Sequence, residues 1–176
     1  MRQNRRRGLA ILCGLALAGC SGVDQPNRAA DSPPPSAAVS ATGTAHAGPA
    51  CAHDLGGTAP SDPHRLVLDA VVLPTTTLVP QESGEPDWLF AKHGLVVRAG
   101  TSAEIRVAPE VADRVRIGWG SPGPEGTTIH VPACQSASGW LAFAGGYTVR
   151  SATCVPLIVR ANGRQERVGV SVGAAC

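Results

Sequence analysis

The sequence is poor in aromatic residues, has a single lysine and contains no long apolar run. Aromatic side chains make up 3% of its 176 residues, and Lys92 is the one lysine. Its apolar stretches are shorter than the roughly 18 residues expected of a membrane-spanning helix. Apolar residues also hardly recur at the spacing of a helical turn, which disfavours an α-helical fold.

Signatures of common enzyme classes are missing too. The sequence contains no Ser-x-x-Lys, no His-Glu-x-x-His and no phosphate-binding loop ending in Gly-Lys-Ser or Gly-Lys-Thr. Such patterns hold a nucleophile, a zinc ion or a phosphate in a defined local geometry. A catalytic triad is defined by geometry and can assemble without a local signature. We therefore expect no enzymatic activity, with an undetected hydrolase as an alternative.

The first twenty residues follow the layout of an export signal. Three arginines, Arg5 to Arg7, precede the apolar residues 8–17, and the tetrapeptide Leu17-Ala18-Gly19-Cys20 ends the segment. About ten apolar residues match the core of a signal segment and are too few to span a bilayer as a helix. Over this stretch the chain resembles bacterial lipoproteins, whose lipobox ends in the cysteine that receives lipid.

The resemblance implies that residues 1–19 are removed as a signal peptide and that Cys20 begins the mature chain. A diacylglyceryl group on the Cys20 thiol and an acylated amino terminus would then anchor the protein stably, because two lipid signals suffice for anchoring. The expected location is the outer face of the cell membrane. An ordinary secretory signal and a twin-arginine signal built on residues 5–7 remain alternatives.

Loss of the signal changes the charge of the chain. The full sequence has 15 basic and 13 acidic residues, and the signal carries four arginines and no acid. The mature chain therefore has 11 basic and 13 acidic residues, and its net charge is −2 instead of +2. This weakly acidic balance gives no support to nucleic-acid binding.

Residues 20–50 are predicted to be the lipidated cysteine and a disordered tether. The segment is rich in Ala, Ser, Pro and Gly, includes Pro33-Pro34-Pro35, and has hardly any large apolar side chain. Such a segment buries too little apolar surface to offset its ordering entropy.

Four cysteines follow the tether: Cys51, Cys134, Cys154 and Cys176. An even number in a small exported domain predicts two disulfides. Three pairings are possible, and we favour Cys134–Cys154 across a hairpin with Cys51–Cys176 joining the domain ends.

Residues 51–176 are predicted to form this disulfide-linked domain as an all-β, antiparallel, immunoglobulin-like sandwich. Short runs rich in β-branched residues alternate with Gly and Pro, which is typical of such a fold. We expect eight or nine strands, at residues 66–73, 94–98, 103–107, 114–119, 128–132, 139–143, 147–150, 155–160 and 167–172. Two hairpins are expected, one between 94–98 and 103–107 and one over Asn162-Gly163, a strong turn signal.

Charge is unevenly distributed along the mature chain. Residues 21–90 hold eight acids and two bases, whereas residues 91–176 hold nine bases and five acids. Arg106, Arg114 and Arg116 are expected to project from neighbouring strands and to bind an anion, since guanidinium groups bind phosphate and carboxylate in bidentate fashion. The alternative is that these arginines are solvated strand faces, partly paired with the acidic first half.

Histidines and tryptophans suggest weaker candidates. His46, Cys51, His53, Asp54 and His64 lie close together in sequence and include ligand types suited to copper or zinc. Trp119 shares its face with apolar residues and is expected in the core. Trp140 is expected over the Cys134–Cys154 bridge, or as a stacking platform for sugar rings. Trp88 either docks on the sandwich or forms an exposed anchor for a partner.

The sequence thus predicts a lipid-anchored protein of the cell envelope that acts as a non-enzymatic binding or scaffolding module without a cofactor. Its expected partners are the membrane, through the lipid, and an anionic envelope polymer or another envelope protein. The alternative is a metal-handling lipoprotein that uses the histidines near Cys51.

Overall fold

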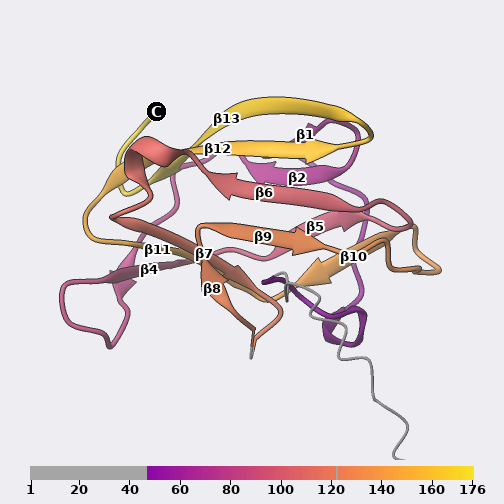
Figure 1. Ribbon diagram of the computed structural model, residues 1–176, viewed down its shortest axis with the longest axis horizontal. Helices are drawn as coiled ribbons and strands as arrows, with labels where there is room; N and C mark the ends of the chain where they lie inside the picture. Colours follow the sequence, from indigo (N-terminus) through magenta and orange to yellow (C-terminus); the bar gives the residue numbers. More distant parts are fainter. Residues whose placement is uncertain (1–46, 122) are drawn as a thin grey trace, which may run out of the picture. The chain divides into compact units, whose positions relative to one another are not determined.

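The computed structural model describes residues 47–121 and 123–176, which form an antiparallel β-sandwich (Figure 1). They contain thirteen strands in three sheets and two 3-10 turns, η1 (Cys51–His53) and η2 (Pro109–Val111). The all-β prediction is confirmed, whereas the immunoglobulin-like type stays a prediction. Among these residues no helix is long and apolar enough to cross a membrane. The predicted signal peptide, Cys20, and residues 21–46 lie outside the described residues.

Each sheet is named here by its strand order. Sheet A has the order β1 (His64–Val67), β2 (Val71–Pro74), β5 (Leu95–Arg98) and β10 (Trp140–Phe143). Sheet B has the order β13 (Arg164–Val172), β12 (Thr153–Ala161), β6 (Ala103–Val107) and β9 (Thr128–Val131), which lie side by side in Figure 1. Sheet C has the order β3 (Gln81–Glu82), β4 (Leu89–Lys92), β11 (Gly145–Val149), β7 (Val115–Trp119) and β8 (Glu125–Gly126).

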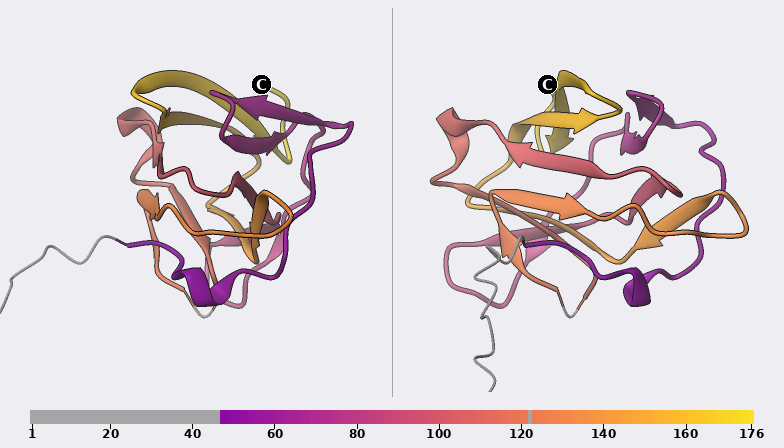
Figure 2. Two further views of the ribbon diagram at one scale, coloured as in Figure 1. Left: turned by 90° about the vertical axis from the view of Figure 1, so that its right-hand side faces the viewer. Right: turned by 45° about the vertical axis from the view of Figure 1, so that its right-hand side comes forward.

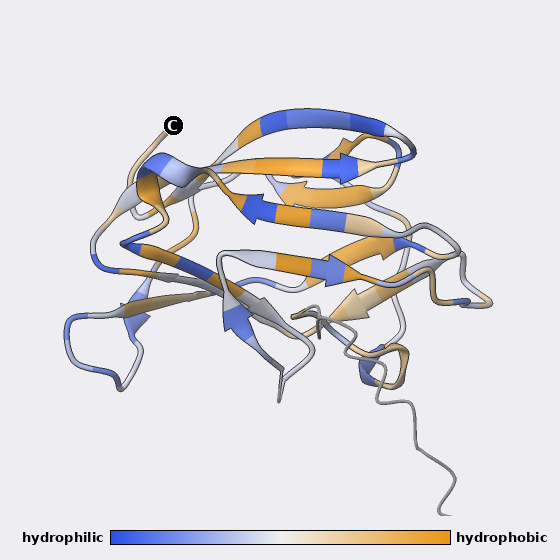
Figure 3. Cartoon of the chain, in the orientation of Figure 1, coloured by the Kyte–Doolittle hydropathy of each residue, from blue (hydrophilic) through white to orange (hydrophobic). Residues whose placement is uncertain are grey.

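Apolar and polar residues alternate along many of the strands, so that each strand buries one face. On β6, Ala103, Ile105 and Val107 are buried, whereas Glu104 and Arg106 are partly exposed. Figure 3 shows this alternation of apolar and polar residues along the β6 ribbon. Because successive side chains of a strand point to opposite faces, the sequence pattern alone determines which of them reach the core.

Trp119 at the end of β7 is buried in the core, as predicted, and is 1% exposed. Its indole Nε1 donates a hydrogen bond to the His93 carbonyl at 2.9 Å. Its ring meets the buried Tyr147 ring edge to face, with centroids 5.5 Å apart. Such aromatic pairs add about 0.5–1.5 kcal/mol beyond the area that they bury.

His93 lies between β4 and β5, is partly buried and contacts two other rings. Its ring stacks on His64, with centroids 5.9 Å apart, and lies 6.3 Å from the Tyr147 ring. The His93 Nε2 atom is buried and has no hydrogen-bond partner among the described residues. Burial first, and then repulsion from His64, lower the pKa of His93 from 6.5 to about 4. Burial likewise raises the pKa of the Tyr147 phenol.

The lowered pKa of His93 predicts a loss of stability in mild acid. Above pH 6.5 the ring is neutral in both states, so it contributes no pH dependence. Between pH 6.5 and about 4 the unfolded chain binds a proton that the folded chain excludes, and folding weakens as pH falls. The expected loss is about 2 kcal/mol, after a discount for the part of the ring that contacts solvent.

Urea unfolding from pH 7 to pH 4 measures this effect. We expect His93→Leu to flatten the fall in unfolding free energy relative to the wild type. The other ionisable groups are common to both proteins, so the difference between the two curves reports His93 together with its repulsion from His64. Parallel curves would contradict the assignment.

Two predicted strand connections are wrong, and one is confirmed. Residues 66–73 are not one strand, because the chain reverses between β1 and β2 at Leu68 and Asp69, whose φ angles are 52° and 57°. Residues 94–98 and 103–107 do not form a hairpin, because β5 belongs to sheet A and β6 to sheet B. The hairpin over Asn162-Gly163 joins β12 to β13 as expected, with both turn residues at positive φ.

The segment before β1 covers two sheet edges. The Ala47 carbonyl accepts a hydrogen bond from the His130 amide on the edge strand β9, and the Leu55 amide donates to Ala142 on the edge strand β10. Asp54 Oδ1 accepts a second hydrogen bond from the Ala142 amide at 2.8 Å. Figure 2 shows this segment running along the side of the domain. Covered edges cannot pair with strands of other molecules. Because Ala47 already bonds to β9, the folded part begins before Cys51.

Two disulfides are present, and their pairing corrects the prediction. Cys51 is joined to Cys134, and Cys154 is joined to Cys176. The Cys51 bridge ties the edge-covering segment to the chain that follows β9. Cys154 cannot reach Cys134 in this arrangement, because Cys154 lies on β12, beside the chain end that carries Cys176.

Polar contacts connect sheets A and B at the tip of the β12–β13 hairpin. Arg164 forms an ion pair with Asp69 at 2.8 Å, and the Asn162 side-chain amide donates to the Leu68 carbonyl at 3.0 Å. Arg65 lies 3.8 Å from Glu166 on β13. The exposed pairs contribute about 0–1 kcal/mol each.

Candidate functional site: a polar groove on sheet B

A row of polar side chains crosses all four strands of sheet B on its outward face. Strand register aligns Gln165 with Arg160, Arg160 with Glu104, and Glu104 with His130. Since β12 and β13 are joined by a two-residue turn, the pairing of Gln165 with Arg160 follows directly from the position of Asn162-Gly163.

The row is linked by hydrogen bonds and charge. Arg160 Nε donates to Gln165 Oε1 at 2.7 Å, and Arg160 Nη1 donates to Glu104 Oε1 at 3.1 Å. The second oxygen of the Glu104 carboxylate lies 3.7 Å from His130 Nδ1. Glu104 therefore sits between a guanidinium and an imidazole, and it neutralises part of the charge of Arg160.

An open groove of about 910 Å³ lies along this row. One wall is the segment Gly48, Pro49 and Ala50, and the other residues come from the ends of β6, β9, β12 and β13. A side chain at position 48 would collide with the His130 carbonyl oxygen, so only glycine lets this segment lie so close to β9. The groove presents Glu104, His130, Arg160 and Arg164 to the solvent.

The next row on the same face contains two more arginines. Strand register aligns Arg167, Ile158, Arg106 and Thr128. Arg167 forms an ion pair with Glu110 of η2. A backbone hydrogen bond at Glu110, and then Arg167, hold the pKa of Glu110 below its usual value. Ile158 points outward between the arginines yet is only 9% exposed, and arginine stems can cover such a side chain.

Arg106 differs from its neighbours. It forms no ion pair and no hydrogen bond among the described residues, and its Nε atom is buried without a partner. Leaving a charged donor buried and unpaired costs free energy. An anion bound at the partly exposed part of this side chain would offset some of that cost through its charge.

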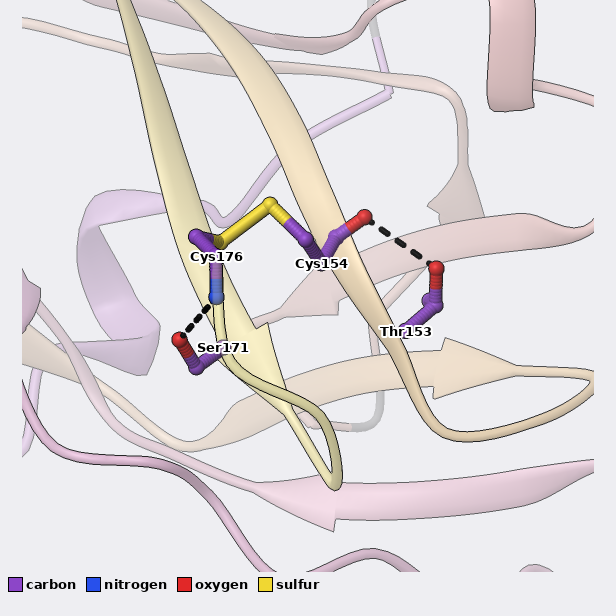
Figure 4. Close-up of a disulfide and its surroundings, with 4 residues drawn as sticks. All are labelled: Thr153, Cys154, Ser171 and Cys176. Carbon is purple, nitrogen blue, oxygen red and sulfur yellow. Dashed lines mark hydrogen bonds between the residues drawn. A yellow bond between two sulfur atoms is a disulfide. The ribbon is translucent and has the colours of Figure 1, made fainter.

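The C-terminal disulfide covers the far end of the same face. Cys176 folds back over β13, and its amide donates to Ser171 Oγ at 3.0 Å (Figure 4). Gly169 makes room for it, because a side chain there would approach the Cys176 sulfur to 2.8 Å. The sheet B face is therefore bounded by the disulfide at one end and by the groove at the other.

The three arginines predicted as one patch do not lie on one sheet. Arg106 is on β6 of sheet B, Arg116 is on β7 of sheet C, and the two strands do not pair. Arg114 precedes β7, and its Nη1 atom lies 3.5 Å from Oδ1 of the neighbouring Asp113. The prediction is wrong because a short connection does not make two strands neighbours: η2 leads the chain from β6 in sheet B to β7 in sheet C.

Arg116 takes part in a separate network on sheet C. It forms an ion pair with Glu85 at 2.7 Å and lies 3.9 Å from Glu125. The guanidinium carbons of Arg116 and Arg150 lie 4.0 Å and 4.5 Å from the centroid of the Trp88 ring. Trp88 therefore docks on the domain. The contacts of Arg116 with Glu85 and of Arg164 with Asp69 show that the basic second half pairs in part with the acidic first half.

Other candidates from the sequence have different surroundings. Trp140 is 8% exposed and carries Arg98 over its ring at 4.6 Å; the bridge that it was expected to cover does not exist. Cys51 is oxidised, and His46 lies outside the described residues. Within residues 47–121 and 123–176, no group of three or more His, Cys, Asp or Glu is placed to hold a metal ion.

Two short glycine patterns occur outside their usual context. The pattern Gly-x-Ser-x-Gly occurs at residues 169–173. Its serine, Ser171, lies within β13, and the Ser171 Oγ accepts a hydrogen bond from the Cys176 amide. That pattern marks a nucleophile when the serine sits on a strand-to-helix turn. The pattern Gly-x-Gly-x-x-Gly occurs at residues 118–123. In dinucleotide-binding proteins this pattern leads from a strand into a helix, whereas here the next element after β7 is the strand β8.

The chain matches no protein-family model, and no curated protein and no solved structure shows significant similarity to it. The function is therefore inferred from the site itself.

Sequence reasoning missed Arg160 and Arg167 as companions of Arg106. A signal for part of this set was present, since the Asn162-Gly163 turn pairs Arg160 with Gln165 and places Arg167 two positions further along the same face. The pairing of β6 with β12 had no such signal, because 45 residues separate Val107 from Thr153.

Proposed function

We propose that this protein is a lipid-anchored, non-enzymatic binding module of the cell envelope, and that the outward face of sheet B is its binding surface. The observation that carries the binding role is the groove with its row of arginine, glutamate and histidine side chains. Ligand sites are concave and present a few convergent polar groups, as this groove does.

Export is supported by two independent features. The tetrapeptide ending at Cys20 resembles a lipobox, and the four cysteines after it form two disulfides. Disulfides form and persist in oxidising compartments and are rare in the cytosol. A bound anchor at Cys20 would keep the domain at the membrane surface, where envelope components are its natural ligands.

Metabolic labelling with a fatty acid tests the anchor. We expect the wild-type chain to incorporate label and to sediment with membranes, and Cys20→Ala to lose both properties. Cys13→Ala is the matched control, because it removes a cysteine from the same segment but leaves the lipobox intact; it should retain the label. Label on the Cys20→Ala variant would contradict the proposal.

The binding role has its own test. The chain carrying Cys20→Ser, which lacks the predicted lipid, is mixed with delipidated envelope purified from cells that produce the protein. Retention in the pellet is the expected result. A chain that stays in the supernatant at all protein concentrations tested would show that the domain does not bind the envelope.

A further inference from the structure

We infer that the sheet B face binds a linear polyanion, a polymer with phosphate or carboxylate groups repeated along an extended chain. This inference rests on the proposed function and names the chemistry of its ligand. The surface concerned consists of the groove and the row beside it, and its charged members are Glu104, Arg106, His130, Arg160, Arg164 and Arg167.

The charge of this surface favours an anion. Three guanidinium groups, those of Arg106, Arg160 and Arg167, share the outward face with one carboxylate, Glu104. A fourth, Arg164, lines the end of the groove, although its register partner Ala161 is buried. Two further carboxylates, Asp69 and Glu110, reach the surface from outside. The pairs of Arg164 and Arg167 with these outer carboxylates are more than half exposed at the arginine. Exposed pairs are weak, so an incoming anion can compete for both arginines.

Arg106 supplies the strongest single attraction. It has no partner among the described residues, and its Nε is already shielded from water. A phosphate or carboxylate oxygen at this group would form a charge-assisted hydrogen bond without displacing a protein carboxylate.

The spacing of the arginines fits repeated charges. Neighbouring strands are ~4.8 Å apart, and residues two apart along a strand are ~6.7 Å apart. The Cα atoms of Arg106 and Arg160 are therefore about 8 Å apart on adjacent strands, and those of Arg106 and Arg167 are about 10 Å apart across β12. Arg160 is held by Gln165 and Glu104, and Arg167 is held by Glu110, so the guanidinium groups are directed to different places along the face. An extended chain can contact each of them in turn.

A polymer fits this surface better than a membrane does. The groove is concave, and one wall, Gly48 to Ala50, rises beside it. The large apolar side chains exposed among the described residues are Leu55, Leu66 and Val79, and none of them lines the groove. Proteins that dock on a bilayer by a surface usually insert apolar side chains.

Binding to defined probes tests the inference. The full chain carrying Cys20→Ser is titrated by calorimetry with linear polyphosphate, polygalacturonate, inorganic phosphate and vesicles of half phosphatidylglycerol and half phosphatidylcholine. We expect both polymers to bind at least tenfold more tightly, per anionic group, than inorganic phosphate. Binding should weaken steeply from 0.05 to 0.5 M salt, since exposed charges are screened.

Variants locate the site. Arg106→Gln is expected to weaken polymer binding about tenfold, and Glu110→Gln, which releases Arg167, is expected to strengthen it. Arg150→Gln is the matched control, because it removes the same charge from a side chain that lies over Trp88, away from sheet B, and should leave binding unchanged. Equal losses in Arg106→Gln and Arg150→Gln, binding to vesicles alone, or no preference for polymers would each overturn the inference. If the chain still sediments with envelope in that case, the proposed function stands without this ligand.

Discussion

Replacing Cys51 and Cys134 together with alanine is expected to lower the free energy of unfolding by about 4–5 kcal/mol. The bridge closes a loop with a sequence separation of 83 residues. In the chain-entropy model, a longer closed loop restricts the unfolded chain more, so this bridge stabilises the fold strongly. Most small domains have a total stability of only about 5–15 kcal/mol, so this loss would be a large fraction of it.

The second disulfide provides the comparison. Cys154 and Cys176 are separated by 22 residues, which predicts a loss of about 3 kcal/mol in the double alanine variant. Urea unfolding of both variants under oxidising conditions gives the two values. An equal loss, or a larger loss for the C-terminal pair, would show that chain entropy does not govern these bridges.

Loss of the first bridge should also expose sheet edges. Cys51 lies between Ala47, which covers β9, and Leu55, which covers β10. Once the segment is released, the amides of His130 and Ala142 lose their partners, and both edges become available to other strands. Light scattering is expected to rise in Cys51→Ala/Cys134→Ala and to stay low in Cys154→Ala/Cys176→Ala.

The number of disulfides was predictable from the sequence, but their pairing was not. Cysteine count and export context indicate two bridges, whereas four cysteines allow three connectivities. The choice depends on which sheet edges the first and last segments cover. That is a property of strand order, and nothing near Cys51 or Cys176 in the sequence reports it.

The faces of strands were similarly easier to predict than their neighbours. Alternation correctly placed Val115, Ile117 and Trp119 in the core. It also placed Arg106 and Arg116 outward, yet it could not tell that these residues lie on different sheets. The candidate site on sheet B depends on the pairing of β6 with β12, a contact between distant parts of the chain.

Glycines in the middle of the sequence were the most misleading signal. Gly145 and Gly146 fall between the strands that the sequence predicts at residues 139–143 and 147–150. They are instead the first residues of β11, which lies between β4 and β7 in sheet C. The absence of a side chain, rather than a turn, explains them: a Cβ at Gly145 would fall on the Gly118 carbonyl oxygen and within 2.7 Å of the Trp119 Cα.

Gly145→Ala is therefore expected to destabilise the protein by about 3 kcal/mol or more. The atoms in the way belong to the backbone of β7 and to the buried Trp119, so no flexible side chain can move aside. Gly126→Ala on β8 of the same sheet is the matched control. A Cβ there meets Thr128 at 3.9 Å, an ordinary contact, and its effect should stay within about 1 kcal/mol and on the stabilising side, because alanine restricts the unfolded chain. Chemical unfolding of the two variants decides the matter. If Gly145→Ala is as stable as Gly126→Ala, β11 and β7 do not approach each other as closely as this register requires.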